Sequence, residues 1–183
     1  MFISKVFLTL FALLLSTALA APAPIRQAPS RDDLQLSTRG LGQLAKAAGM
    51  ALKIKKNLHP TPGKAVFWSG SRPGKSGPVS VGADAERFAA KHGKEVLNPS
   101  LQKHGINIPS RKESPYSNKL WGFASKVYAQ RASGHVHAVL GSTRRPGNIY
   151  DTIEKPILMK NKKVTKITEH NAETGKATVV KGK

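Results

Sequence analysis

The stretch LWGFASKVYAQRASGHVHAVLGSTRRPGNIYDTIE, residues 120–154, decides how the chain folds. Its first part carries Trp121 and Ser125 at helical spacing, so both side chains share one face of a predicted helix. Residues 135–140 then alternate imidazole and apolar side chains, as a half-buried strand does. A basic, turn-rich loop follows and leads to Glu154 at a predicted strand end. Helix, strand, arginines and glutamate together predict a pocket for an anionic ligand that contains a ring.

The N-terminus has the features of a secretory leader. Lys5 precedes a short apolar run, residues 6–15, and a stretch of small residues ends at Ala20. The run is too short to span a bilayer, and a buried N-terminal helix fits the small-residue end less well. We therefore expect a secreted, extracellular protein that is cut after Ala20. Residues 21–40, which begin with an Ala- and Pro-rich stretch, are predicted to be a disordered or pro-region.

The charge of the chain is strongly positive, with 30 Lys and Arg against 10 Asp and Glu and a formal net charge of +20. Such a field attracts nucleic acid, anionic lipid surfaces and phosphorylated small molecules, but it equally describes a solvated cationic surface without a specific partner. The chain has no cysteine. Disulfides, thiolate metal sites and cysteine nucleophiles are therefore excluded, and stability must come from the core.

The segment from 41 to 63 is predicted to be a basic helix and a linker. Leu41, Leu44 and Leu52 fall on one side of this helix. This amphipathic pattern fits two roles: a helix that packs against the domain through its leucines, or a membrane-surface or pro-region helix.

Residues 64–180 are predicted to form one small α+β domain, with helices first and a small sheet at the C-terminal end. The expected strands are residues 64–70, 135–140, 157–158, 164–168 and 177–180, and the expected helices are residues 81–91, a short segment from 98 or 99, and 121–132.

His135 and His137 lie two apart on a strand, so both point to one face. This spacing suits a metal pair or a general acid–base pair. However, zinc needs a third ligand, and no acidic residue stands at a diagnostic spacing. Half-exposed strand histidines without a catalytic role are the simpler interpretation.

Six short motifs occur in an order that resembles the ADP-ribosyl cyclase family. This family comprises animal NAD glycohydrolase and cyclase ectoenzymes and shorter bacterial toxin-like relatives. The motifs are FWSG at 67–70, AxxFA at 85–89, VLNPS at 96–100, WxxxSxxYA at 121–129, GHVHAVLGS at 134–142 and IYDTIE at 149–154. The resemblance covers residues 64–170 and implies a cyclase-like cleft that binds NAD.

The resemblance also implies roles for individual residues. Trp68 and Trp121 match the two tryptophans that flank the nicotinamide ring, and Glu154 matches the catalytic glutamate. Ser125 matches a serine near the phosphates, and Asn98 stands where the family has a second acidic residue. That departure bears on the balance between hydrolysis and cyclisation, and on activity itself.

The remaining substrate-binding residues implied by the resemblance lie in two loops. Ser69 and Gly70 follow the first tryptophan, and together with Ser142 and Arg144 they are expected to hold the pyrophosphate. NAD is the expected substrate, and neither a metal nor a further cofactor is expected.

The sequence thus predicts a secreted enzyme that cleaves the nicotinamide–ribose bond of NAD. Two alternatives stay open. One is a cationic toxin or effector that binds or cuts RNA, using His135, His137 and the lysines. The other is an inactive family member that binds NAD without turnover, because Asn98 carries no charge.

Overall fold

The computed structural model describes residues 31–182 of the 183-residue chain, and the predicted leader lies outside them. The chain divides by internal contacts after Arg39, and the second unit, Gly40–Lys183, is a single small α+β domain, as predicted. In chain order the described elements are α2 (Arg31–Asn57), β1 (Ala65–Ser69), β2 (Ser71–Arg72), β3 (Val79–Ser80), α3 (Gly82–Lys91), β4 (Glu95–Val96), α4 (Leu97–Lys103), α5 (Ser117–Arg131), β5 (Gly134–Leu140), the π-helix η1 (Tyr150–Glu154), α6 (Lys155–Lys160), β6 (Val164–Asn171) and β7 (Ala177–Lys181).

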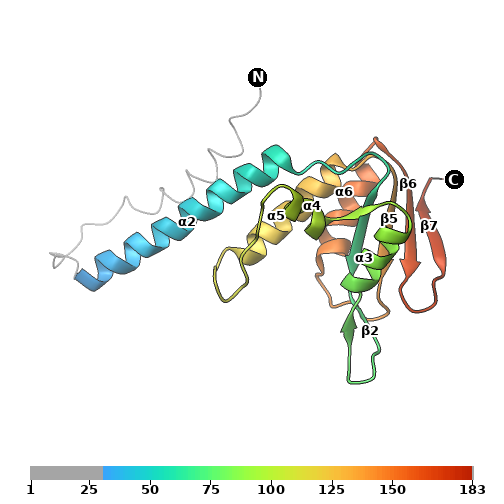
Figure 1. The fold of residues 1–183 in the computed structure, drawn as a ribbon, viewed down its shortest axis with the longest axis horizontal. Helices are drawn as coiled ribbons and strands as arrows, with labels where there is room; N and C mark the ends of the chain where they lie inside the picture. The colour runs from blue at the N-terminus through green and yellow to red at the C-terminus, as the bar shows by residue number, and fades with distance from the viewer. Residues whose placement is uncertain (1–30, 183) are drawn as a thin grey trace, which may run out of the picture. The chain divides into compact units, whose positions relative to one another are not determined.

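The main sheet has five strands in the order β4-β1-β5-β6-β7 (Figure 1). β4, β1, β5 and β6 pair in parallel, and β7 closes the sheet as an antiparallel edge strand. The sheet therefore takes two strands, β1 and β4, from the half of the chain predicted to be mainly helical. Because the four parallel strands share a direction, their carboxyl ends lie along one edge of the sheet.

One face of the sheet is covered by α5 and holds the larger apolar cluster. Along β1 and β5, Phe67, Val136 and Ala138 point into this cluster, where Tyr128 of α5 meets the Phe67 ring edge-on at a centroid distance of 5.3 Å. The hydroxyl of Tyr128 donates to the backbone oxygen of Glu95 at 2.9 Å. The predicted helical face of Trp121, Ser125 and Tyr128 is thus the face that α5 turns toward the core.

The opposite face of the sheet is covered by α3 and holds a smaller apolar cluster. Val66 and Val139 contribute to it from β1 and β5, and Ala85 and Ala89 from α3. The alternation of side chains along a strand explains the division, since neighbouring residues of β1 and β5 point to opposite faces. His135 and His137 share the parity of Val139 and lie on this second face.

α2 begins earlier than predicted and packs on the core through other residues than the predicted leucines. It begins at Arg31, after the last proline of the Ala- and Pro-rich stretch, so part of the predicted disordered region is helical. The side chains that pack on the core are those of Ala47, Met50, Ala51, Ile54 and the following Leu58.

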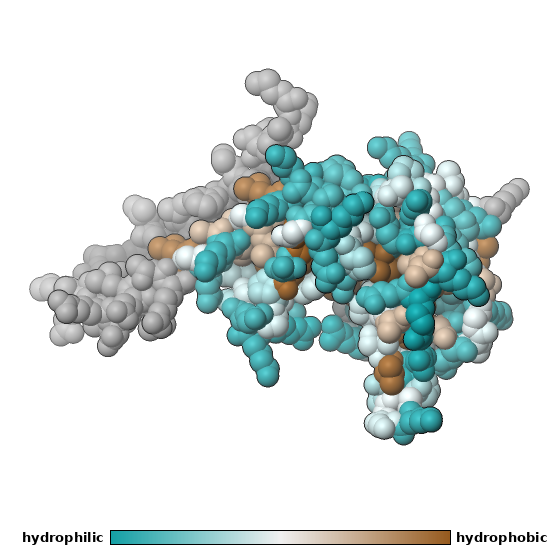
Figure 2. Space-filling model, viewed as in Figure 1, coloured by the Kyte–Doolittle hydropathy of each residue, from teal (hydrophilic) through white to brown (hydrophobic). Residues whose placement is uncertain are grey.

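The leucines of α2 that were predicted to mark its packing face are exposed instead. Leu41 is 63%, Leu44 37% and Leu52 57% exposed. The face of the molecule seen in Figure 2 is mostly hydrophilic, with scattered hydrophobic patches. Within residues 31–182, no helix combines the length and the apolar character needed to cross a bilayer.

The segment around Glu154 is helical, which corrects the prediction of a strand end. Glu154 is the last residue of the π-helix η1, and Ile157 and Leu158, also predicted to be a strand, belong to α6. Pro156 lies in the first turn of α6, where its fixed φ angle and missing N–H favour a helix start. π-Helical turns are rare and often occur at functional sites.

Candidate active site

Glu154 and Ser125 form a buried pair between η1 and α5. Glu154 is 5% and Ser125 4% exposed. Burial raises the pKa of Glu154 to about 8, and a hydrogen bond from the Ser125 side chain lowers it in part. The carboxyl group is therefore mainly protonated at neutral pH in the empty protein. A cation that binds beside it would favour the ionised form.

A cavity of about 650 Å³ lies near this pair, but neither Glu154 nor Ser125 lines it. Trp121 lines it, and Ser125 follows Trp121 on the same face of α5, about 6 Å further along the helix axis. Ile153 also lines the cavity and directly precedes Glu154. The full lining is Ser110, Arg111, Ser117, Asn118, Trp121, Gly122, Arg145, Ile149 and Ile153. The Glu154–Ser125 pair thus lies one helical turn from a cavity large enough for a small ligand.

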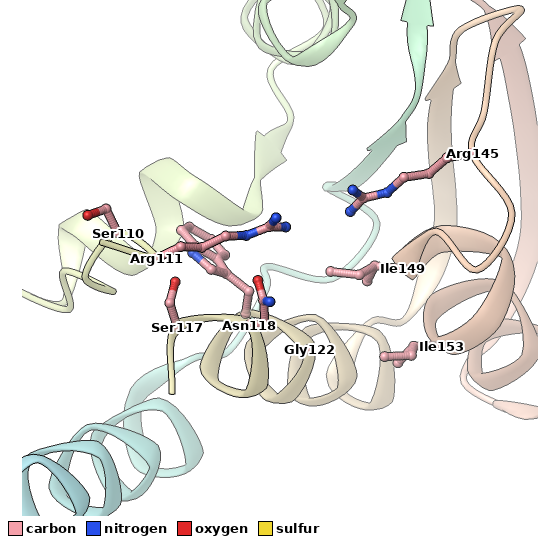
Figure 3. A pocket seen from close by; sticks show the side chains of 9 residues that line it. Ser110, Arg111, Ser117, Asn118, Gly122, Arg145, Ile149 and Ile153 are labelled. Carbon is pink, nitrogen blue, oxygen red and sulfur yellow. The ribbon is translucent and has the colours of Figure 1, made fainter. Parts of the chain in front are cut away.

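Two arginines from different loops give this cavity its charge. Arg111 belongs to the loop between α4 and α5, and Arg145 to the loop between β5 and η1. Both guanidinium groups point into the same space above α5 (Figure 3). No carboxylate lines the cavity. In the sequence Arg145 stands out only as a neighbour of Arg144, and Arg111 was not predicted, because a lone arginine in a polar loop carries no motif.

Asn148 fixes the loop between β5 and η1 to the end of β1. Its side-chain oxygen accepts hydrogen bonds from the Ser69 hydroxyl at 3.0 Å and from the Asp151 backbone N–H at 3.0 Å. Its amide group donates to the Arg145 carbonyl and to the Asp151 carboxylate at 3.0 and 2.7 Å. Ser69, predicted to contact substrate, is therefore a buried structural partner of Asn148, a residue that was not predicted from the sequence.

Arg144 and Ser142 lie away from the Trp121 cavity. The guanidinium of Arg144 pairs with Asp151 at 3.1 Å, and the Ser142 backbone N–H donates to Glu173 at 3.2 Å. Both residues line a second cavity of about 390 Å³ at the carboxyl ends of β5 and β6. The structure therefore places the predicted phosphate-binding arginine in an ion pair, and brings its neighbour Arg145 into the cavity beside Trp121.

Trp68 and Trp121 pack against different faces of the sheet. Trp68 contacts the cluster under α3, where its ring lies about 3.3 Å from the position of a Cβ on Gly82, whereas Trp121 packs against the cluster under α5. Because Phe67 points into the α5 cluster, strand alternation turns Trp68 the other way. Trp68 does not line the Trp121 cavity, so the expected pair of tryptophans facing one ring is not brought together there.

The backbone after Trp68 is paired with the loop after β5. The Ser71 N–H donates to the Thr143 carbonyl at 2.9 Å, and the Thr143 N–H donates to the Ser71 carbonyl at 3.1 Å. Gly70 has φ 91°, and a Cβ there would lie 2.6 Å from the Thr143 carbonyl oxygen. Only glycine fits this close approach. The backbone geometry thus explains why glycine stands at position 70. The Ser71 N–H already donates to the Thr143 carbonyl and is not free to bind a phosphate.

Asn98 lies in the first turn of α4 and is half-buried. It lines neither cavity. The neighbouring Leu97 and Leu101 pack into the α5 cluster and fix the position of the helix. The structure therefore places Ser125 beside Glu154 and Trp121 one helical turn from Ser125. It does not bring these three residues into one common cleft with the other predicted site residues, which are Trp68, Ser69, Gly70, Asn98, Ser142 and Arg144.

The histidines form a packed cluster under α3. The rings of His135 and His137 have centroids 4.0 Å apart, and Nδ1 of His137 lies 2.9 Å from Nε2 of His170. Phe88 covers His170 at 4.6 Å. Burial lowers the pKa of His137 to about 3, and its Nε2 has no hydrogen-bond partner. A neutral, covered imidazole is poorly suited to acid–base chemistry on RNA, and no metal-binding trio is found among residues 31–182.

Three comparisons with known proteins were made, and similarity to this chain was found among solved structures. No protein-family model and no curated protein sequence matches it. Among solved structures, it is similar to Aplysia cyclase complexed with substrate NGD and product cGDPR, with 23% identity, a TM-score of 0.44, and coverage of 61% of this chain and 49% of the cyclase. It is also similar to an ADP ribosyl cyclase complexed with N1-cIDPR, with 23% identity, a TM-score of 0.42, and coverage of 61% and 50%. The chain spans about half the length of these cyclases.

Proposed function

We propose that the chain is an NAD glycohydrolase or ADP-ribosyl cyclase-like enzyme that cleaves the nicotinamide–ribose bond of NAD. One observation carries the proposal. A buried carboxyl group, Glu154, lies beside Ser125 of α5, and Trp121, one helical turn earlier on the same helix, lines a cavity. This arrangement can hold an aromatic ring on Trp121 and direct the bond attached to it toward the carboxylate.

The chemistry requires only one carboxylate. The nicotinamide of NAD is a cationic pyridinium, so it takes the electrons of the C–N bond and leaves as a neutral molecule without a general acid. Ordinary glycoside hydrolysis, by contrast, uses two carboxyl groups. The ribose carbon that remains has oxocarbenium character, and the ionised Glu154 stabilises it. Addition of water with loss of a proton gives ADP-ribose, and attack by the adenine ring of the same molecule gives a cyclic product.

The pKa of Glu154 predicts the pH dependence of this reaction. The ionised form is required, and the pKa of the group in the free protein is about 8. We expect kcat/KM to rise with pH and to level off above about pH 8, since kcat/KM reports the free enzyme. The pyridinium of bound NAD favours the ionised carboxylate, so the same rise in kcat is expected at lower pH.

Nicotinamide release from NAD by the purified chain tests the proposal. We expect Glu154→Gln to lower the rate by at least about 100-fold, as loss of an essential charged group does. The exposed Glu86 of α3 offers a matched control, because Glu86→Gln removes the same charge away from the cavity. Equal rates for wild type and Glu154→Gln would refute the proposal. NAD binding without turnover at any pH between 5 and 9 would instead indicate an inactive, NAD-binding protein.

A further inference from the structure

One side of α2 carries an apolar stripe that remains exposed. Leu41, Leu44 and Leu52 form it, and the exposed Ala48 lies between the last two. At about 100° per residue, these side chains fall within one sector of about 80° around the helix axis. The stripe extends for about 17 Å along the helix. The leucines therefore form one apolar surface, although the core takes its contacts from the other side of α2, which includes Ile54.

Positive charge lies at the C-terminal end of this stripe. Lys55 and Lys56 occupy the last turn of α2, three and four residues after Leu52, so they share its side of the helix. Both lysines are exposed, and neither takes part in an ion pair within residues 40–182. Between Asp33 and Asp84 the sequence contains no acidic residue. Nothing in this stretch of sequence therefore offsets the charge next to the leucines.

The combination of leucines and lysines decides which partner fits this side of α2. Nucleic acid offers phosphates to the lysines but no apolar layer to the leucines. A second copy of the chain brings the same lysines to the contact, and like charges oppose its approach. An anionic lipid surface offers negative headgroups above an apolar layer, which matches both features.

We propose that residues 41–56 of α2 bind an anionic lipid surface as an interfacial helix. Leu41, Leu44 and Leu52 enter the boundary between headgroups and acyl chains, and Lys55 and Lys56 contact the headgroups. The core-facing side chains lie about 120° around the helix from the leucines, so the domain and the lipid do not compete for the same side of α2. No residue of α2 lines the cavity beside Trp121, so lipid binding and NAD cleavage are tested independently.

Cosedimentation with lipid vesicles tests the proposal. The protein used begins at Ala21, as the predicted cleavage leaves it, so that the apolar run of the leader does not contribute. We expect vesicles of phosphatidylcholine with about 30% phosphatidylserine to bind it at least about 10-fold more tightly than vesicles of phosphatidylcholine alone, with the preference declining as salt rises. Equal binding to both kinds of vesicle, or binding to neither, overturns the proposal.

Replacement of the leucines separates insertion from attraction by net charge. Leu41→Gln combined with Leu52→Gln keeps a high helix propensity and should weaken binding to the anionic vesicles about 10-fold or more. Met159→Gln combined with Val179→Gln removes two exposed apolar side chains outside α2 and should bind like the wild type. If the leucine variant binds like the wild type, the net charge alone attracts the protein and the proposal is wrong.

Replacement of the lysines tests the headgroup contact. Lys55→Gln combined with Lys56→Gln should weaken binding about 5-fold or more. Lys103→Gln combined with Lys162→Gln removes the same charge from exposed positions outside α2 and should weaken it less than about 2-fold. Equal losses in the two variants would overturn the assignment to α2.

Light scattering reports the other possible occupant of the stripe, a second copy of the chain. We expect the protein to be a monomer without vesicles, and Leu41→Gln combined with Leu52→Gln to leave its mass unchanged. A dimer that this double variant dissociates, together with no binding to vesicles, would overturn the proposal and assign the stripe to self-association.

Discussion

A titratable group is buried on each side of the main sheet, and burial shifts the two pKa values in opposite directions. Under α5, burial raises the pKa of the Glu154 carboxyl to about 8, and under α3 it lowers the pKa of the His137 imidazole to about 3. In both cases the low-dielectric surroundings favour the neutral form. What differs is the neighbourhood, since Glu154 directly follows Ile153, which lines a cavity, whereas His137 packs among aromatic rings. A shifted pKa therefore indicates a site only where a ligand has room to approach.

The largest expected effect that tests this comparison is a fall in the free energy of unfolding at alkaline pH, caused by Glu154. The pKa of the group is 4.5 in the unfolded chain and about 8 in the folded protein, so the stability linked to its protonation is complete below pH 4.5 and is lost as the pH rises to 8. The expected slope approaches about 1.4 kcal/mol per pH unit. Urea denaturation at pH 5 to 8 should show this fall in the wild type and a flatter profile in Glu154→Gln. Parallel profiles would mean that Glu154 is not protonated in the folded protein.

The His137 face should show the opposite trend at acid pH. Its folded pKa lies near 3 and its unfolded value near 6.5, so its contribution to stability is complete above pH 6.5 and is lost as the pH falls toward 3. The cationic groups that oppose its protonation are His135, Lys94, His170 and His92. His137→Phe should make the free energy of unfolding less dependent on pH between 6.5 and 4, measured by denaturant titration.

Part of the acid dependence should remain in His137→Phe. The pKa values of His135 and His170 are lowered as well, mainly by burial. Lys91→Ala, an exposed change at the end of α3, is the matched surface control. If His137→Phe keeps the full acid slope of the wild type, the histidine cluster is not the source of acid destabilisation.

Replacement of Ser125 is expected to have a smaller effect, which tests how Ser125 contributes to the pKa of Glu154. Its hydrogen bond lowers the pKa of Glu154, so Ser125→Ala should raise that pKa further. A hydrogen bond to a charged group is typically worth about 1.5–3 kcal/mol, which corresponds to a shift of about 1–2 pH units. The rise of kcat/KM with pH should move upward by that amount. An unchanged pH profile would separate Ser125 from the titration of Glu154.

The smallest effect concerns the ion pair at the rim of the same face. Arg144 and Asp151 are both about one-third exposed, with side-chain exposures of 34% and 39%. Exposed pairs contribute at most about 1 kcal/mol. Arg144→Ala should therefore lower the free energy of unfolding by less than this amount, and high salt should abolish the difference. A loss of several kcal/mol would show that Arg144 has a role in the core of the loop.

The sequence predicted the elements whose pattern depends on local spacing. β1, α3, α5 and β5 occur where their periodicities placed them, because each presents a clear apolar face or alternation. The helical state of Glu154 was missed because η1 and α6 are too short to show a helical period. α2 has two apolar stripes, and only the packed structure shows that Ile54 and not Leu52 faces the core.

The site was predictable only where both partners lie on one regular element. Trp121 and Ser125 share a helix, so their common orientation follows from spacing alone. Arg111 and Arg145 line one cavity from loops that lie far apart in the sequence, and Asn148 bonds to the distant Ser69. No local sequence pattern predicts such neighbours. The separation of Trp68 from Trp121 depends on the faces of a sheet whose strand order the sequence does not reveal.

The interior position of β1 in the sheet, between β4 and β5, has a consequence for how the protein is made. β1 pairs through Val66 with His137 of β5, and β5 pairs with β6, so the sheet closes only after distant segments have been synthesised. Contacts of such long sequence separation make folding slow, because a large loop must close before they form. Most of the chain must therefore be synthesised before the cavity beside Trp121 can form. An N-terminal fragment that ends before β6 lacks the strand that pairs with β5, so we expect it not to form the complete sheet around Glu154.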